Sequence, residues 1–300
     1  MGRVGGKRCA VGGGRPGSAG LVTVWEMKSW TLDDIAWDRF DPGKVDSDIL
    51  KLVKAAALVE RNGLDYATYL NNVFGDDGEF RPLADAWAAE EVRHGEVLGR
   101  WARLADPAFD FDSAFATFRA NYTLPLDVRE SVRGSRAGEL MARCMVETGT
   151  SSYYAALRDS TDEPVLRQIC QYVAADELRH YKLFYTHMGR YLATEGLGRW
   201  ARLRIGVGRL REAEDDELAQ AYFAANAGSG ARYDRQIYSA AYLARAYRLY
   251  RPGHLQRAVA MALKAAGLPA NGRMNDWLTR WGYRFLRNRL TKLERVAAAA

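Results

Sequence analysis

The chain has 300 residues, of which 48% are hydrophobic and 27% charged, a globular composition long enough for one large domain or two ordinary ones. Its formal net charge of +6 at pH 7 favours an acidic partner or an anionic surface without deciding the fold. Its apolar runs stay short of the roughly 18–20 residues that span a bilayer, which argues against a transmembrane helix.

The first 26 residues differ from the rest of the chain. They are rich in glycine and basic residues and lack the apolar segment of a secretory signal. This composition predicts a disordered tail, or an upstream start assigned ahead of a true start at Met27.

From about residue 45, apolar residues recur at helical spacing, and Gly, Pro and Asp mark the breaks. The pattern predicts an almost entirely helical chain. Long helices are expected at 45–73, 79–105, 132–160 and 162–195, a short one at 112–121 inside the connection 106–131, and further helices at 198–226, 232–250, 253–266 and 272–296.

Two helices, a long crossover and two more helices are the connectivity of a ferritin-like four-helix bundle. We therefore predict an all-α fold with a long crossover and additional C-terminal helices. Residues 27–225 would form the bundle, and residues 226–300 a helical extension packed on it.

One stretch of the chain occurs twice. "AAEEVRHGEVL" begins at Ala88 and "AADELRHYKLF" begins at Ala174. Each copy contains E-x-x-H, which places the two side chains on one helix face. A single E-x-x-H is weak evidence, but the chain has only four histidines, and two of them stand in these matched copies. The pairs are Glu91 with His94 and Glu177 with His180.

The apolar residues at helical spacing from each pair predict that these acidic groups point toward the core. Around the first pair they are Trp87, Leu98 and Trp101, and around the second Val173, Ala174 and Phe184. The preceding helix of each pair offers one further acid, Glu60 in "AAALVERNGLDYATYL" and Glu147 in "MARCMVETGTSSYY".

Glu60 sits among inward neighbours predicted as Val53, Ala56, Ala57, Leu64 and Ala67, and Glu147 among small or uncharged residues. Glu60 precedes Glu91 by 31 residues, and Glu147 precedes Glu177 by 30. The spacings predict two helix pairs related by an approximate two-fold axis.

Four carboxylates turned into one core would cost at least several kcal/mol per unpaired ion. Two divalent cations would cancel their charge, and oxygen and imidazole ligands suit iron or manganese rather than a closed zinc site. The alternative, that these six residues are ordinary surface groups, does not explain the doubled spacing.

The segments "AEEVRHGEVL", "ICQYVAADELRHY", "VERNGLDYATYL" and "VETGTSSYY" resemble the iron-binding segments of soluble acyl-acyl-carrier-protein desaturases over roughly residues 45–195. The resemblance implies that two Fe ions are held by Glu60, Glu91, His94, Glu147, Glu177 and His180. It also implies that Thr150 faces the O2 side, and that Asp176 accepts a hydrogen bond from a ligand imidazole.

The chain departs from this family pattern at Val92, Leu178 and Tyr181. None of the three is a ligand position, so the iron site is unaffected. They are positions where a partner or electron donor would dock, which puts recognition of a carrier protein in question.

The resemblance implies an O2-dependent oxidoreductase that introduces a cis double bond into a fatty acyl chain. The chain has no flavin, nicotinamide or Fe–S motif, so electrons would come from an external donor such as a ferredoxin. The expected partner is an acyl carrier protein or another acyl substrate; a nucleic-acid partner is not predicted, and a homodimer is compatible with the sequence. Ala67, Gly149 and Ser152 are small enough to leave room for an acyl slot.

Other functions remain open because a fold does not fix a substrate. They are a hydroxylase or N-oxygenase of the same di-iron class, and a non-enzymatic iron-handling or membrane-associated protein. A rubrerythrin-type peroxidase is disfavoured because the chain lacks a four-cysteine module. Cys9, Cys144 and Cys170 show no pairing pattern, which fits a reducing cytoplasm.

The last predicted helix, 272–296, is amphipathic and basic. Trp277, Trp281, Phe285 and Leu286 are predicted to share one face, with arginines and a lysine around it. This pattern suits a membrane surface or an acidic partner. It equally suits a helix packed on the bundle with a basic rim.

Overall fold

The computed structural model describes residues 29–212, 216–228 and 230–298. It divides into two compact units, 1–34 and 35–300. The described part of the first unit contains the short 3-10 helix η1 (Leu32–Asp34), where the backbone N–H and hydroxyl of Thr31 donate to Asp34 Oδ2. The prediction made for residues 1–26 lies outside the described residues.

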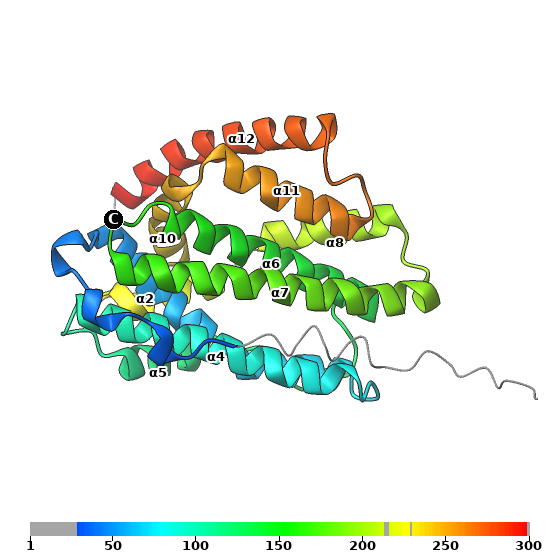
Figure 1. The fold of residues 1–300 in the computed structure, drawn as a ribbon, viewed down its shortest axis with the longest axis horizontal. Helices are drawn as coiled ribbons and strands as arrows, with labels where there is room; N and C mark the ends of the chain where they lie inside the picture. The colour runs from blue at the N-terminus through cyan, green and yellow to red at the C-terminus, as the bar shows by residue number, and fades with distance from the viewer. Residues whose placement is uncertain (1–28, 213–215, 229, 299–300) are drawn as a thin grey trace, which may run out of the picture. The chain divides into compact units, whose positions relative to one another are not determined.

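The described residues of the second unit are helical apart from turns and connections (Figure 1). Two 3-10 helices come first, η2 (Trp37–Arg39) and η3 (Pro42–Lys44). The α-helices are α2 (Ser47–Arg61), α3 (Gly63–Val73), α4 (Phe80–Ala105), α5 (Phe111–Asn121), α6 (Arg136–Arg158), α7 (Pro164–Glu195), α8 (Arg199–Glu212), α9 (Asp216–Asn226), α10 (Arg235–Leu249), α11 (Pro252–Ala266) and α12 (Arg273–Ala298).

The centre of this unit is a four-helix bundle. One pair consists of α4 and the consecutive helices α2 and α3, the other of α6 and α7, and α4 packs on α7 to join them. The connection between the pairs carries α5, as expected for the long crossover. The predicted all-α, ferritin-like fold is therefore confirmed. Fully buried side chains such as Leu52, Leu98, Leu140 and Phe184 fill the bundle.

Polar caps fix the ends of the bundle helices. The Asp46 carboxylate accepts from the first backbone N–H groups of α2, and the Ser135 hydroxyl accepts from Gly138 N at the start of α6. At the start of α7, Glu163 caps the backbone and Pro164 occupies the first turn, where its missing N–H costs nothing. Gly196, with φ of 65°, ends α7 in the left-handed conformation.

The helix predicted at 45–73 is two helices with a break at Asn62. The physical reason is the close approach of this segment to α4. A β-carbon at Gly63 would lie 2.6 Å from Glu91 Cβ, and one at Gly95 would lie 2.5 Å from Arg61 N. These two glycines let the end of α2 press against α4. Leu64, predicted to point inward, is instead 61% exposed.

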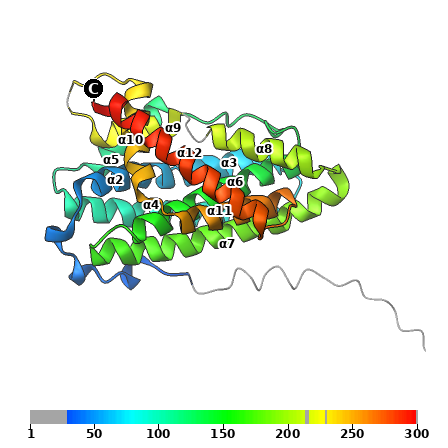
Figure 2. The same ribbon diagram turned by 90° about the horizontal axis from the view of Figure 1, so that it is seen from above.

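The remaining helices cover the bundle. The predicted segment 198–226 contains α8 and α9, and residues 213–215 between them are not described. The helices α8 and α11 pack on α6, α9 packs on α2 and α5, and α10 packs on α9 (Figure 2). Among the described residues, no helix has the length and apolar character needed to cross a membrane.

Helix α12 packs on α10 and α11 through Leu286 and Leu290, which are both buried. Trp277, Trp281 and Phe285 are exposed on its outer side. The prediction that Leu286 shares their face is therefore wrong. Leu286 directly follows Phe285, and one residue along a helix turns the side chain by about 100°.

Candidate metal centre

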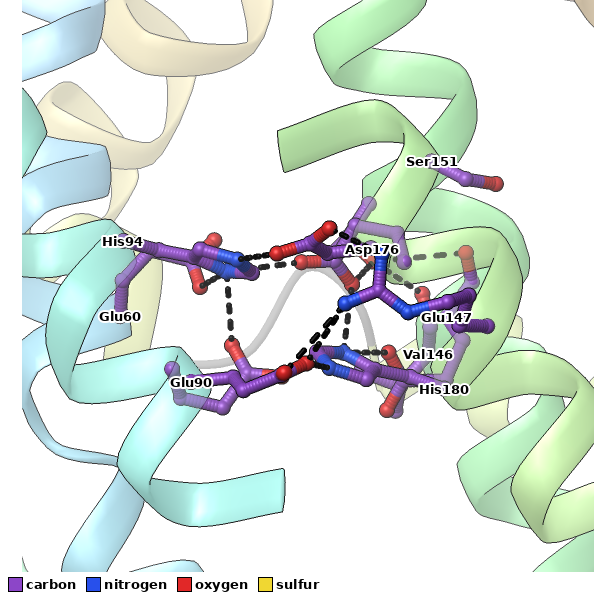
Figure 3. A network of polar contacts seen from close by, with 12 residues as sticks. Glu60, Glu90, His94, Val146, Glu147, Ser151, Asp176 and His180 are labelled. Carbon is purple, nitrogen blue, oxygen red and sulfur yellow. Dashed lines mark hydrogen bonds and ion pairs between the residues drawn. The ribbon is translucent and has the colours of Figure 1, made fainter. Parts of the chain in front are cut away.

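The structure brings together the six acidic and histidine side chains that the sequence singled out (Figure 3). Helices α2, α4, α6 and α7 each contribute one or two of these side chains. Glu60 comes from the last turn of α2, Glu91 and His94 from α4, Glu147 from α6, and Glu177 and His180 from α7. All six are buried, and both imidazoles are 0% exposed.

The six residues form two overlapping groups. Glu60, Glu91, His94 and Glu177 make one group, and Glu91, Glu147, Glu177 and His180 make the other. Within each group, one potential ligand atom from every residue lies within 4.8 Å of the others. Each group could hold a metal ion. Glu91 and Glu177 belong to both groups, so each of these carboxylates would help to hold two ions.

The two imidazoles turn the same ring atom toward the carboxylates. His94 Nδ1 lies 3.2 Å from Glu177 Oε1 and 3.6 Å from Glu60 Oε2. His180 Nδ1 lies 3.0 Å from Glu91 Oε1. The rings are tilted by 32° with centroids 5.7 Å apart. Both Nδ1 atoms are thus placed to serve as ligands in the two groups.

The other ring nitrogen of each imidazole contacts an outer carboxylate on the opposite helix pair. His94 Nε2 lies 3.1 Å from Asp176 Oδ2, and His180 Nε2 lies 2.9 Å from Glu90 Oε2. Asp176, predicted to accept a hydrogen bond from a ligand imidazole, makes one of these contacts. Sequence reasoning missed Glu90, although it stands directly before Glu91 as Asp176 stands before Glu177. The two residues occupy the same position in the repeat, so aligning its two copies would have indicated Glu90.

Two arginines complete this outer layer, and they also come from the repeat, one residue before each histidine. Arg93 Nη2 lies 3.2 Å from Asp176 Oδ2, and Arg179 Nη2 lies 3.1 Å from Glu90 Oε2. Burial acts to raise the pKa of Asp176, but the hydrogen bond and charge of His94, together with Arg179, bring that pKa down to about 2. The outer carboxylates therefore stay ionised.

The inner carboxylates experience opposing influences. Burial raises the pKa of Glu60 and of Glu147 well above the ordinary glutamate value. Burial also acts to raise the pKa of Glu91, yet the charge and hydrogen bond of His180 hold it well below that value. Some carboxylates of the cluster thus favour the protonated form and others the ionised form, because the buried site cannot hold four negative charges without cations. Bound cations would stabilise the ionised form of all four.

Two hydroxyl groups contact the inner carboxylates. Thr150 Oγ1 donates to Glu177 Oε2 at 2.6 Å, and Tyr154 OH donates to Glu60 Oε1 at 2.6 Å. Sequence reasoning singled out Thr150 and missed Tyr154. Tyr154 follows Glu147 by seven residues, or about two helical turns, so helical spacing was the available signal.

Thr150 lies close to the molecular surface. Thr150 is half-buried and Gly149 beside it is exposed, with no atom within 4 Å of the place a β-carbon would take. Ala67 and Ser152, the other small residues proposed for a slot, are buried. Surface hollows of about 460 and 390 Å³ lie elsewhere, and neither is lined by any of the six residues.

The three departures from the family pattern have different environments. Leu178 is 51% exposed, and Val92 is half-buried. Tyr181 is buried, and its hydroxyl donates to Met261 O of α11 at 2.8 Å. Tyr181 thus joins α7 to the covering helices rather than standing on a free surface. Cys144 and Cys170 are buried free thiols.

The comparison with protein families agrees with this geometry. The family model described as fatty acid desaturase matches residues 56–197, a segment that contains all six residues of the two groups. No curated protein matches the chain. The chain is therefore similar to this family over slightly less than half of its length, and the buried carboxylate–histidine groups lie within that part.

Proposed function

We propose that the protein is a di-iron, O2-dependent desaturase that introduces a cis double bond into a fatty acyl chain. One observation carries the proposal. Two groups of buried ligands share Glu91 and Glu177, and both groups lie in the segment matched by the fatty acid desaturase family. The six residues are proposed as the ligands of the two ions.

The donor set fits iron. It offers four carboxylates and two imidazoles, a set that suits iron or manganese, and the four negative charges equal the positive charge of two divalent ions. Two iron ions bound here would supply the reductive activation of O2 that removal of hydrogen from an unactivated C–H bond requires. Metal analysis of purified protein distinguishes iron from manganese.

The outer carboxylates prepare the imidazoles for this role. Asp176 and Glu90 face the Nε2 atoms, so an imidazole whose Nδ1 held a metal ion would keep its proton on Nε2 and donate it to the facing oxygen. Without a metal ion, burial acts to lower the pKa of both histidines, but the surrounding carboxylates raise it well above the ordinary value, so Nδ1 carries a proton that the metal ion would replace. Arg93 and Arg179 keep the outer carboxylates charged and oriented. The outer carboxylates thereby fix the orientation of each ring, and they would fix its tautomer once a metal ion is bound.

The two hydroxyls hold the inner carboxylates in position. Tyr154 orients Glu60 from the buried side, and Thr150 orients Glu177 next to the exposed Gly149. We propose that Thr150 faces the side from which O2 approaches. Its hydroxyl donates to Glu177 Oε2, so its proton is held at that oxygen.

The overall reaction needs two electrons from outside the chain. Two hydrogens leave the acyl chain, and with two electrons and two protons from a donor they reduce O2 to two waters. The basic chain, with its formal charge of +6, is complementary to acidic proteins. We propose an acyl carrier protein as the bearer of the acyl chain and a ferredoxin-type protein as the electron donor.

The test uses protein expressed with ample iron and supplied with a ferredoxin, its reductase and acyl carrier protein loaded with saturated acyl chains. Gas chromatography with mass spectrometry should show a monounsaturated product that the double variant Glu91→Ala/Glu177→Ala does not form. A hydroxylated product would identify a hydroxylase of the same class. Iron-loaded protein that consumes reductant but leaves acyl chains unchanged would overturn the proposed substrate.

A further inference from the structure

The outer side of α12 carries three exposed aromatic side chains in a row, which we name the aromatic ridge. Trp277, Trp281 and Phe285 are 57%, 56% and 49% exposed. The rings of Trp277 and Trp281 are stacked with centroids 6.5 Å apart, and those of Trp281 and Phe285 with centroids 5.6 Å apart. The ridge is therefore a continuous apolar strip along the helix.

The ridge is not part of the core. The buried side of α12 is formed by Asn275, Thr279, Leu286 and Leu290, which face α10 and α11. In Figure 1, α12 lies along the upper edge of the second unit, with no labelled helix beyond it. Packing among the described residues therefore accounts for one side of α12 and leaves its aromatic side exposed.

Basic side chains flank the ridge. Helix α12 contains seven arginine and lysine residues but only two acids, Asp276 and Glu294. Arg280 and Arg284 stand three residues after Trp277 and Trp281, so they lie beside the rings on the same outer side, and both are exposed. Glu294 is held by Arg248 at 2.9 Å, which leaves the outer side strongly basic.

We propose that the aromatic ridge docks on the surface of an anionic lipid bilayer, with α12 lying in the plane of the interface. Tryptophan and phenylalanine rings would enter the boundary between headgroups and acyl chains, where such rings are favoured. Arg280 and Arg284 would reach lipid phosphates beside them. This attachment is peripheral and does not depend on the metal centre.

The arrangement favours a bilayer over an acidic protein. A protein hot spot is usually an anchor held in a fitted pocket and ringed by contacts that exclude water. The ridge instead runs from Trp277 to Phe285 along α12, a span of about 12 Å at 1.5 Å per residue, and all three of its rings are exposed. A row of rings with guanidinium groups along one flank fits a broad, flat and negatively charged surface.

The proposal is tested by flotation of the full-length protein with vesicles of phosphatidylcholine containing about 30% phosphatidylglycerol, compared with pure phosphatidylcholine. The ridge variant is Trp277→Ser/Trp281→Ser/Phe285→Ser, and the charge variant is Arg280→Glu/Arg284→Glu. Trp200→Ser on α8 is the matched control, because Trp200 is 79% exposed and outside the ridge. Thermal unfolding verifies that each variant is folded.

Wild type and the Trp200→Ser protein should float with the anionic vesicles, and both ridge and charge variants should lose at least about tenfold in binding. Quenching of tryptophan fluorescence by brominated acyl chains should disappear in the ridge variant. Wild type that stays in solution, or a ridge variant that floats as well as wild type, would overturn the proposal. Ridge-dependent binding to acidic acyl carrier protein without vesicle binding would also overturn it, in favour of a protein-docking surface.

Discussion

His94 on α4 is held by Asp176 on α7, with Nε2 and Oδ2 3.1 Å apart. In the same way, His180 on α7 is held by Glu90 on α4, with Nε2 and Oε2 2.9 Å apart. Each helix therefore orients the imidazole of the other, and the two E-x-x-H segments form one unit that neither could form alone. Metal binding should consequently depend on residues that are not themselves ligands.

We expect Asp176→Asn to lower metal affinity by about 10–100-fold, because the substituted amide accepts a hydrogen bond from His94 less strongly and no longer neutralises Arg93 and Arg179. Glu90→Gln should lower metal affinity in the same way, through His180. Isothermal titration of metal-free protein with Fe2+ under anaerobic conditions measures the effect. Asp162→Asn is the control, since the Asp162 side chain is 89% exposed. Equal affinity in all three variants would remove the positioning role.

The sharing of Glu91 and Glu177 predicts different metal contents for different variants. Wild type should carry about two Fe per chain, as its ligand set implies. Glu91→Ala/Glu177→Ala should carry essentially none, because both groups lose two ligands. Glu60→Ala removes a ligand from one group only, so it should retain about one Fe. Mass spectrometry of the metal in purified protein measures the number of Fe per chain. Two Fe in the double variant would contradict the shared site.

Thr150→Val should keep the iron but impair the coupling of electron use to product formation. Valine has nearly the same size as threonine but cannot donate to Glu177 Oε2. Thr150→Ser, which keeps the hydroxyl, should restore most of the coupling. The measurement is the ratio of product formed to O2 consumed at equal iron content. Unchanged coupling in the valine variant would leave Thr150 as a packing residue.

Gly95→Ala should destabilise the protein by about 1–3 kcal/mol, the usual cost of overpacking. The new β-carbon would lie 2.5 Å from Arg61 N and 2.7 Å from Arg61 Cα, and backbone cannot move aside as a flexible side chain can. Because Arg61 adjoins Glu60, iron content should fall as well. Gly189→Ala on α7 is the control, as its β-carbon meets nothing within 4 Å. Equal urea midpoints for the two variants would show that the Arg61 backbone moves away from residue 95 at no cost in stability.

Asp159 links the end of α6 to the start of α11 and should give a pH-dependent contribution to stability. Its Oδ2 lies 2.9 Å from His254 Nε2 and its Oδ1 2.7 Å from Arg158 Nε. The hydrogen bond from Arg158, aided by His254, lowers the pKa of Asp159 to about 2, against about 3.9 in an unfolded chain.

Because the folded pKa lies below the unfolded one, the stabilisation is present above about pH 4 and is lost as the pH falls toward 2. Asp159→Asn should therefore lower the melting temperature at pH 7, and the difference from wild type should shrink between about pH 4 and 2. Calorimetry at several pH values measures it. A difference that persists undiminished at pH 2 would show that the charge of Asp159 is not its source.

Local pattern in the sequence was enough to predict a helical chain and to single out the six residues of the candidate site. Apolar periodicity fixes where helices run, and the doubled A-A-[ED]-E-x-R-H marks a face on which an acid and a histidine sit together. The residues that contact the site from outside, Glu90, Arg93 and Arg179, also occupy repeated positions. The same repeat would have indicated them.

Other features depended on contacts between segments far apart in the chain. The break at Asn62 follows from how closely α4 passes Gly63. The contacts of His94 with Asp176 and of His180 with Glu90 follow from the antiparallel packing of α4 and α7. Likewise, an amphipathic helix has an apolar side whether it packs on a bundle or faces outward. Only the position of α10 and α11 against Leu286 and Leu290 decided that the aromatic ridge faces away from the core.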